Sequence, residues 1–314
     1  MAPRFSMPAY LKILAYLAVA VAAGALVAPP VFWLGQSLAA SGTSDWLAGF
    51  PFHRVLSRCL QVSMVVLLWP ALRWIGLRRL SELGLRSNSV AWRDLAAGFA
   101  CAVFSVGLLL AALVFGGFSV LRADPNVAAL LRIIGTATVV SVLEEAVFRG
   151  VILGVCLWGL RAKAAILVST LVFVVMHFIK PAKTALAPEQ VTWFSGLAET
   201  LNFAAGLPSM AVLFFGAASL FVAGWILGRA TINTASLWLA IGLHAGWIFG
   251  VQTTNLFYKS SLAEASAHLP WVGPNLVSGA VPTGLLPLAG LVLAGWLARL
   301  YLRHAFRPAV PRVA

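Results

Sequence analysis

The sequence predicts an all-α protein, a polytopic transmembrane helical bundle of about eight spans that forms a single integral membrane domain over residues 1–314. Two observations lead to this prediction. Hydrophobic residues make up 61% of the chain and charged residues only 10%, and the mean hydropathy is +0.95. A soluble domain cannot cover so much apolar surface. In addition, apolar runs close to the ~20 residues that a membrane span needs recur along the chain.

We expect the spans in eight apolar runs that polar, charged or proline-containing segments separate. These runs are residues 11–38, 58–77, 95–121, 133–160, 164–179, 209–227, 235–251 and 284–302. Residues 180–207 form the least hydrophobic long segment between spans, which indicates an interfacial or re-entrant piece. We expect residues 252–282 to form a long polar and proline-rich loop before the last span.

The net charge of +13 does not indicate nucleic-acid binding, because no basic block is interleaved with aromatic residues. The basic residues lie between the apolar runs, where they suit anionic lipid headgroups. With eight spans, fourteen Lys and Arg fall on the side of the termini and seven on the opposite side. The positive-inside rule therefore places both termini in the cytoplasm of what we expect to be a bacterial inner membrane.

Three charged residues stand inside the fourth apolar run, although the whole chain has only nine acidic residues. They are the adjacent Glu144 and Glu145, followed by Arg149. A charge at bilayer depth costs roughly 2.5–3.5 kcal/mol on insertion scales, so three together require an explanation. Glu145 and Arg149 are four residues apart and can pair along one helix face. Glu144 is turned about 100° away, which leaves it free to point at another helix.

Two histidines, His177 and His244, lie deep inside other apolar runs. We measure depth along each helix from the nearest basic residue on the side of the termini, at about 1.5 Å per residue. By this measure Glu144 lies roughly 25 Å, His177 roughly 21 Å and His244 roughly 22 Å from that side. The three side chains thus fall within about one helical turn of each other in depth, and we expect them to converge.

This set of residue types allows several functions. A desolvated carboxylate beside histidines can act as a general base on water, while the histidines orient that water or stabilise an oxyanion. Glu144, His177 and His244 also have the side chains of a zinc site. An intramembrane Glu–Arg pair or a single histidine is often only a bond between spans. A proton-coupled transporter also lines its cavity with Glu and His, but it usually shows interrupted helices in related halves, and none is evident in this sequence.

Three short motifs resemble those of one family. The sequence Glu-Glu-Ala-Val-Phe-Arg at 144–149 matches EExxxR, Phe-Val-Val-Met-His at 173–177 matches FxxxH, and Gly-Leu-His-Ala-Gly-Trp at 242–247 carries the third histidine. In order and spacing they resemble the CPBP family of type II CAAX prenyl endopeptidases and bacterial Abi-type, bacteriocin-processing proteases. The resemblance places a family core at residues 127–251.

The resemblance implies hydrolysis of a peptide bond inside the membrane without a covalent intermediate. By this resemblance Glu144 activates water with help from His177, and His244 stabilises the oxyanion. Glu145, Arg149 and Phe173 are expected to support them. The motifs contain no compact HExxH, which favours a mechanism without metal or other cofactor. Zinc held by Glu144, His177 and His244 is the alternative.

The chain departs from the family in its last motif, HxxxN, because Ile248 stands where the family has asparagine. An oxyanion-hole donor is worth roughly 3–4 kcal/mol in other hydrolases. Possible replacements are Asn202, Asn233, Gln252 and Asn255. A non-catalytic membrane scaffold or immunity regulator of the same family is therefore an alternative to the protease. As substrate we expect a peptide or membrane-protein tail, such as a bacteriocin, immunity or envelope protein, because bacteria prenylate few proteins.

Overall fold

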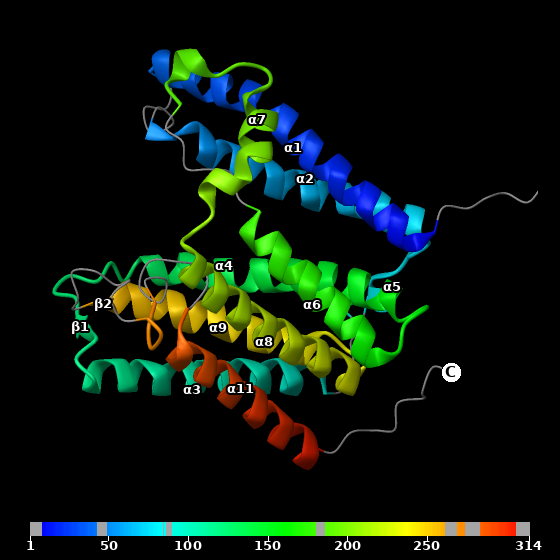
Figure 1. Cartoon of the computed structure of the whole chain (residues 1–314), viewed down its shortest axis with the longest axis vertical. Helices are drawn as coiled ribbons and strands as arrows, with labels where there is room; N and C mark the ends of the chain where they lie inside the picture. The colour runs from blue at the N-terminus through cyan, green and yellow to red at the C-terminus, as the bar shows by residue number, and fades with distance from the viewer. Residues whose placement is uncertain are drawn as a thin grey trace, which may run out of the picture. The chain divides into compact units, whose positions relative to one another are not determined.

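The structure is a computed structural model that describes residues 8–42, 49–83, 85, 90–179, 186–260, 269–273 and 283–305. Helices dominate these residues (Figure 1), which confirms the all-α, polytopic membrane fold. The long helices are α1 (Ala9–Ala40), α2 (Phe52–Ile75), α3 (Ala91–Phe115), α4 (Ala129–Glu145), α6 (Ala162–Phe178), α8 (Met210–Thr234), α9 (Trp238–Phe257) and α11 (Leu285–His304). Shorter elements are η2 (Leu80–Leu83), η3 (Ala146–Leu153), α5 (Gly154–Cys156), η4 (Pro188–Gln190), α7 (Ser195–Leu201) and η5 (Asn202–Gly206).

Five of the described helices are long and apolar enough to cross a membrane, namely α1, α2, α3, α8 and α11. The apolar helix α6 is shorter, with 17 residues. The other two predicted spans are also helical: one is the continuous run of α4, η3 and α5, and the other is α9. The chain is thus an integral membrane protein, while eight crossings and a single domain over residues 1–314 stay predictions.

Several boundaries differ from the predicted ones. The third span ends at Phe115, because Gly117 adopts a φ of +75° and the chain enters a short strand. The sixth was expected to end before Gly228, yet α8 continues to Thr234. Gly228 serves close packing there: a Cβ on it would lie 2.9 Å from Cγ2 of Ile166 on α6. The seventh span extends to Phe257, into the loop predicted at 252–282, of which 261–268 and 274–282 lie outside the described residues.

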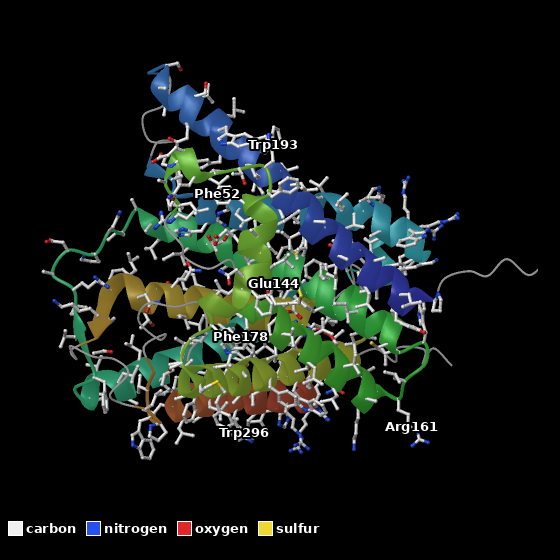
Figure 2. The ribbon with its side chains drawn as sticks, turned by 45° about the horizontal axis from the view of Figure 1, so that its top comes forward. Phe52, Glu144, Arg161, Phe178, Trp193 and Trp296 are labelled. Atoms are coloured by element: carbon white, nitrogen blue, oxygen red, sulfur yellow. The ribbon has the colours of Figure 1, made fainter. Side chains whose placement is uncertain are left out.

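The chain divides into two compact units. We call Met1–Arg78 with Val175–Pro208 the first unit, and Arg79–Val174 with Ser209–Ala314 the second unit. In the first, α1 and α2 form an antiparallel hairpin in which the rings of Phe32 and Phe52 (Figure 2) meet edge to face at 5.5 Å. The helix α7 packs on α1 so closely that a side chain at Gly196 would collide with the carbonyl of Ala25. An interfacial or re-entrant position for residues 180–207 stays a prediction, and 180–185 lie outside the described residues.

Close packing of α9 on α3 organises the second unit. A stripe of glycines, Gly242, Gly246 and Gly250, faces α3. A Cβ on Gly246 would lie 2.7 Å from the carbonyl oxygen of Phe99, and one on Gly250 3.0 Å from Cβ of Val106. Small residues at this spacing let two membrane helices approach through their backbones. The stripe therefore fixes how α9 is rotated, and with it the direction in which His244 points.

A small antiparallel ribbon closes one end of this helix pair. Its strands are β1 (Ser119–Leu121) and β2 (Tyr258–Ser260), with Val120 opposite Lys259. Beside it, Arg122 Nε donates to the carbonyl oxygens of Asn255 and Tyr258, both at 3.2 Å. A basic side chain at this position satisfies carbonyls that the end of α9 leaves without helical partners.

The glycine packing gives a prediction with an internal control on the same helix. A Cβ on Gly98 of α3 would lie 2.5 Å from the carbonyl oxygen of Leu239, whereas one on Gly107 would meet nothing within 4 Å. We expect Gly98→Ala to lower the free energy of unfolding by about 1–3 kcal/mol, because the two backbones must separate. Gly107→Ala should raise it by about 0.5–1 kcal/mol through helix propensity. Thermal unfolding in detergent measures both, and equal melting temperatures would contradict this packing.

Candidate active site

The acidic pair lies where α4 changes its winding. Glu144 (Figure 2) and Glu145 are the last two residues of α4, and the π-helix η3 begins at the next residue, Ala146. Short π-helical segments inside α-helices are rare and occur frequently at functional sites. Here the wider turn carries Arg149 and Phe148, whose side chains are both buried. The local backbone thus distinguishes this segment from the other described membrane helices.

Glu145 and Arg149 form the predicted pair. Arg149 Nη1 donates to Glu145 Oε1 at 2.9 Å, and the two side chains are 1% and 0% exposed. The guanidinium also donates through Nη2 to the carbonyl oxygen of Gly224 on α8, at 3.4 Å. It stacks on aromatic rings as well, 4.5 Å from the Phe173 centroid and 5.8 Å from that of Phe148. Each buried charge therefore has an opposite charge beside it, which low-dielectric surroundings require.

His244 lies between the two glutamates. Its Nδ1 is 2.8 Å from Glu145 Oε1, and its Nε2 is 3.8 Å from Glu144 Oε2. An ionised carboxylate can only accept a hydrogen bond, so the imidazole Nδ1–H donates to Glu145. This bond fixes both the ring orientation and the nitrogen that faces Glu144. The predicted convergence of Glu144 and His244 is thus present in the geometry, and Glu145 joins them.

The direct contact between Glu145 and His244 was not expected. From the helical spacing we expected Glu145 to pair with Arg149 and Glu144 to point at another helix. The imidazole has nitrogens on two sides of its ring, and so one histidine reaches two carboxylates that are about 100° apart on α4. The sequence did contain a signal for this contact, because two adjacent carboxylates in one span could both bond to the single deep histidine of α9.

The depth of roughly 22 Å expected for His244 was wrong. That value assumed one straight helix from Arg229, but α8 continues to Thr234 and the chain turns before α9 begins at Trp238. Only six residues separate Trp238 from His244, about 9 Å along the helix. Glu144 and His244 therefore meet although they do not stand at the equal depths along their helices that the sequence predicted.

Phe173 and His177 lie one turn apart on α6. Phe173 is buried in the second unit, where its ring meets that of His244 at 6.3 Å and 80° and that of Phe148 at 5.0 Å. Phe173 therefore packs against both His244 and Arg149. His177 is half-buried in the last turn of α6 and belongs to the first unit. Its predicted action on the same water as Glu144 stays a prediction.

Ile248 follows His244 by one turn on α9 and brings no polar group. Gln252 and Asn255 stand eight and eleven residues after His244 on the same helix, about 12 and 16 Å further along. Asn233 is exposed near the end of α8, and Asn202 is exposed at the start of η5. Neither Gln252 nor Asn255 therefore stands at the place of the missing family asparagine, and Asn202 belongs to the first unit.

The donor groups of the second unit bear on metal ligation. Within the described part of the chain, no three His, Cys, Asp or Glu side chains are grouped so as to hold a metal ion. His244 directs Nδ1 at Glu145, which leaves Nε2 as the nitrogen that a metal could use. Zinc held by Glu144, His177 and His244 stays the alternative.

Comparisons with known proteins agree with the motifs. Residues 126–250 match the family described as Type II CAAX prenyl endopeptidase Rce1-like. No curated protein and no solved structure matches the chain. The matched range contains every residue of the site, from Glu144 to His244. Residues 126–250 are therefore similar to the type II CAAX prenyl endopeptidase Rce1-like family, as the three motifs predicted.

Proposed function

We propose that the chain is an intramembrane endopeptidase in which Glu144 is the general base. The observation that supports this most is the difference between the two glutamates. Glu145 is fully buried and paired with Arg149, whereas the Glu144 side chain is 29% exposed. Only Glu144 can therefore meet water and substrate.

The proposed reaction begins when Glu144 takes a proton from water, with His177 assisting, and the water oxygen attacks the peptide carbonyl. His244 Nε2 then donates a hydrogen bond to the oxyanion. Because Nδ1–H is held by Glu145, the ring must carry both protons in this step. Glu144 and Glu145, 3.8 and 2.8 Å from its two nitrogens, supply the compensating negative charge. Collapse of the tetrahedral intermediate returns the proton from Glu144 to the leaving amine.

We place this activity in a bacterial inner membrane, with both termini in the cytoplasm and anionic lipid headgroups around the chain. The excess of basic residues on the side of the termini supports this orientation. The substrate class that suits an intramembrane site is a peptide or the tail of a membrane protein. An unprenylated bacterial substrate is favoured over a CAAX protein, since bacteria prenylate few proteins.

A second candidate function is a non-catalytic scaffold or immunity regulator. The observation that favours it is Ile248, which removes one oxyanion donor and leaves no amide in its place. On this alternative the Glu145–Arg149–His244 cluster only holds α4, α8 and α9 together.

The first prediction concerns Glu144. Glu144→Gln keeps the size of the side chain but removes the base, so we expect peptide cleavage to fall to background. Glu189→Gln, on an exposed residue of η4, is the matched control and should leave cleavage unchanged. Comparative analysis of peptide termini in membranes that express each form measures the effect even while the substrate is unidentified. Cleavage products that persist at full level with Glu144→Gln would refute the assignment.

Ile248→Asn separates the two candidate functions. Restoring an amide one turn after His244 adds an oxyanion donor, and we expect kcat to rise roughly tenfold to a hundredfold with little change in KM. The measurement uses a substrate found by applying the same terminus analysis to membranes that express the Ile248→Asn variant. If wild type cleaves nothing and only the Ile248→Asn variant is active, the natural chain is the non-catalytic scaffold or regulator and not the protease.

A metal-free reaction makes a third prediction. We expect purified active protein to contain much less than one zinc per chain by elemental analysis, and a chelator to leave its rate unchanged. Loss of activity with chelator, followed by recovery on adding zinc, would replace the glutamate-only mechanism with the metal-dependent one.

A further inference from the structure

A cluster of basic and aromatic side chains lies at one end of the α1–α2 hairpin, within the first unit. It comprises Lys12 in the second turn of α1, and Trp69, Arg73 and Trp74 in the last turns of α2. We call these four residues the basic-aromatic patch. Because the hairpin is antiparallel, the start of α1 and the end of α2 come together here.

Specific contacts hold the two cations of the patch in place. Lys12 Nζ donates to the carbonyl oxygen of Trp74 at 2.8 Å and lies 5.7 Å from the centre of its ring. Arg73 Cζ lies 5.0 Å from the centre of the Trp69 ring. Such cation–π contacts orient a cation without cancelling its charge. Two full positive charges therefore remain at the surface of the hairpin.

No acidic residue of these helices balances the charge. The sequences of α1 and α2 contain no Asp or Glu, and Arg73 is exposed. Trp69 and Trp74 are 45% and 47% exposed, so their rings present an apolar edge beside the charges. A partner for this surface must combine negative charge with apolar chains.

The position of the patch along α1 matches the depth of lipid headgroups. Trp33, in the C-terminal part of α1, meets Trp193 edge to face at 4.8 Å; Figure 2 labels Trp193. Lys12 and Trp33 are 21 residues apart, about 32 Å along the helix. This length is close to the ~30 Å hydrocarbon thickness of a bilayer, and tryptophan and basic residues are typical of its two interfaces.

We propose that the basic-aromatic patch binds the phosphate of an anionic phospholipid, with Lys12 and Arg73 on the phosphate and Trp69 and Trp74 beside the glycerol and upper acyl chains. A zwitterionic lipid offers less net attraction to two uncompensated cations. The proposal is independent of the catalytic site, since no residue of the patch belongs to it.

The test titrates the full-length protein in neutral detergent with phosphatidylglycerol or phosphatidylcholine of the same acyl chains, and native mass spectrometry counts the bound lipids. We expect wild type to prefer phosphatidylglycerol, and Lys12→Gln with Arg73→Gln to weaken that binding on the order of tenfold or more. Arg54→Gln with Arg58→Gln is the matched control, because it removes the same charge from the opposite end of α2.

The control variant should keep the preference for phosphatidylglycerol. A variant that retains the charges, Lys12→Arg with Arg73→Lys, should also keep it and guards against an effect of misfolding. Equal binding of both lipids to wild type would overturn the proposal. Equal losses of phosphatidylglycerol binding in the two Gln double variants would also overturn it, because net charge alone would then explain the effect. Displacement of the lipid by millimolar glycerol phosphate would indicate a soluble phosphate ligand instead.

Discussion

The second unit depends on one buried carboxylate oxygen. Glu145 Oε1 accepts hydrogen bonds from Arg149 Nη1 at 2.9 Å and from His244 Nδ1 at 2.8 Å. Through these partners a single atom connects α4, η3 and α9, and the guanidinium extends the connection to α8 at Gly224. A carboxylate without exposed surface is tolerated only when cations or donors surround it. In a membrane, a helix gains nearly as much from apolar contact with lipid as from apolar contact with another helix. The pairing of these helices is therefore specified by charge.

Burial also distinguishes the two adjacent glutamates. Glu145 is buried against the arginine and the imidazole that bond to it, and the rings of Phe148 and Phe173 lie against the arginine. Glu144, one residue earlier, keeps part of its surface open while it faces the other nitrogen of the same histidine. The glycine stripe of α9 makes this possible, because close contact with α3 leaves His244 no freedom to rotate with its helix. The direction in which His244 faces the two glutamates is thus set by packing on the opposite face of α9.

Hydropathy was enough to predict the membrane fold, because apolar runs of span length leave few alternatives. The spacing of four residues was also enough to pair Glu145 with Arg149, since that contact lies within one helical segment. The contact of Glu145 with His244 was missed because it depends on the rotation of a second helix, which the glycines of α9 set. The ribbon of β1 and β2 was missed for a related reason. Three-residue strands leave almost no periodic signal, and their pairing joins positions as distant as Val120 and Lys259.

The proposed reaction bears on the meaning of Ile248. As Glu144 accepts a proton from water it loses its negative charge, and the substrate oxygen gains one. Glu144 Oε2 is 3.8 Å from His244 Nε2, the nitrogen that we propose as donor to the oxyanion. In this step Nε2 of the imidazole changes its partner from the Glu144 carboxylate to the oxyanion, while Nδ1 stays bonded to Glu145. The total charge around the imidazole therefore stays constant. A charge-assisted donor is roughly twice as strong as a neutral one. On this mechanism a histidine fixed between two carboxylates carries the oxyanion alone, so an apolar residue at 248 slows the reaction without abolishing it.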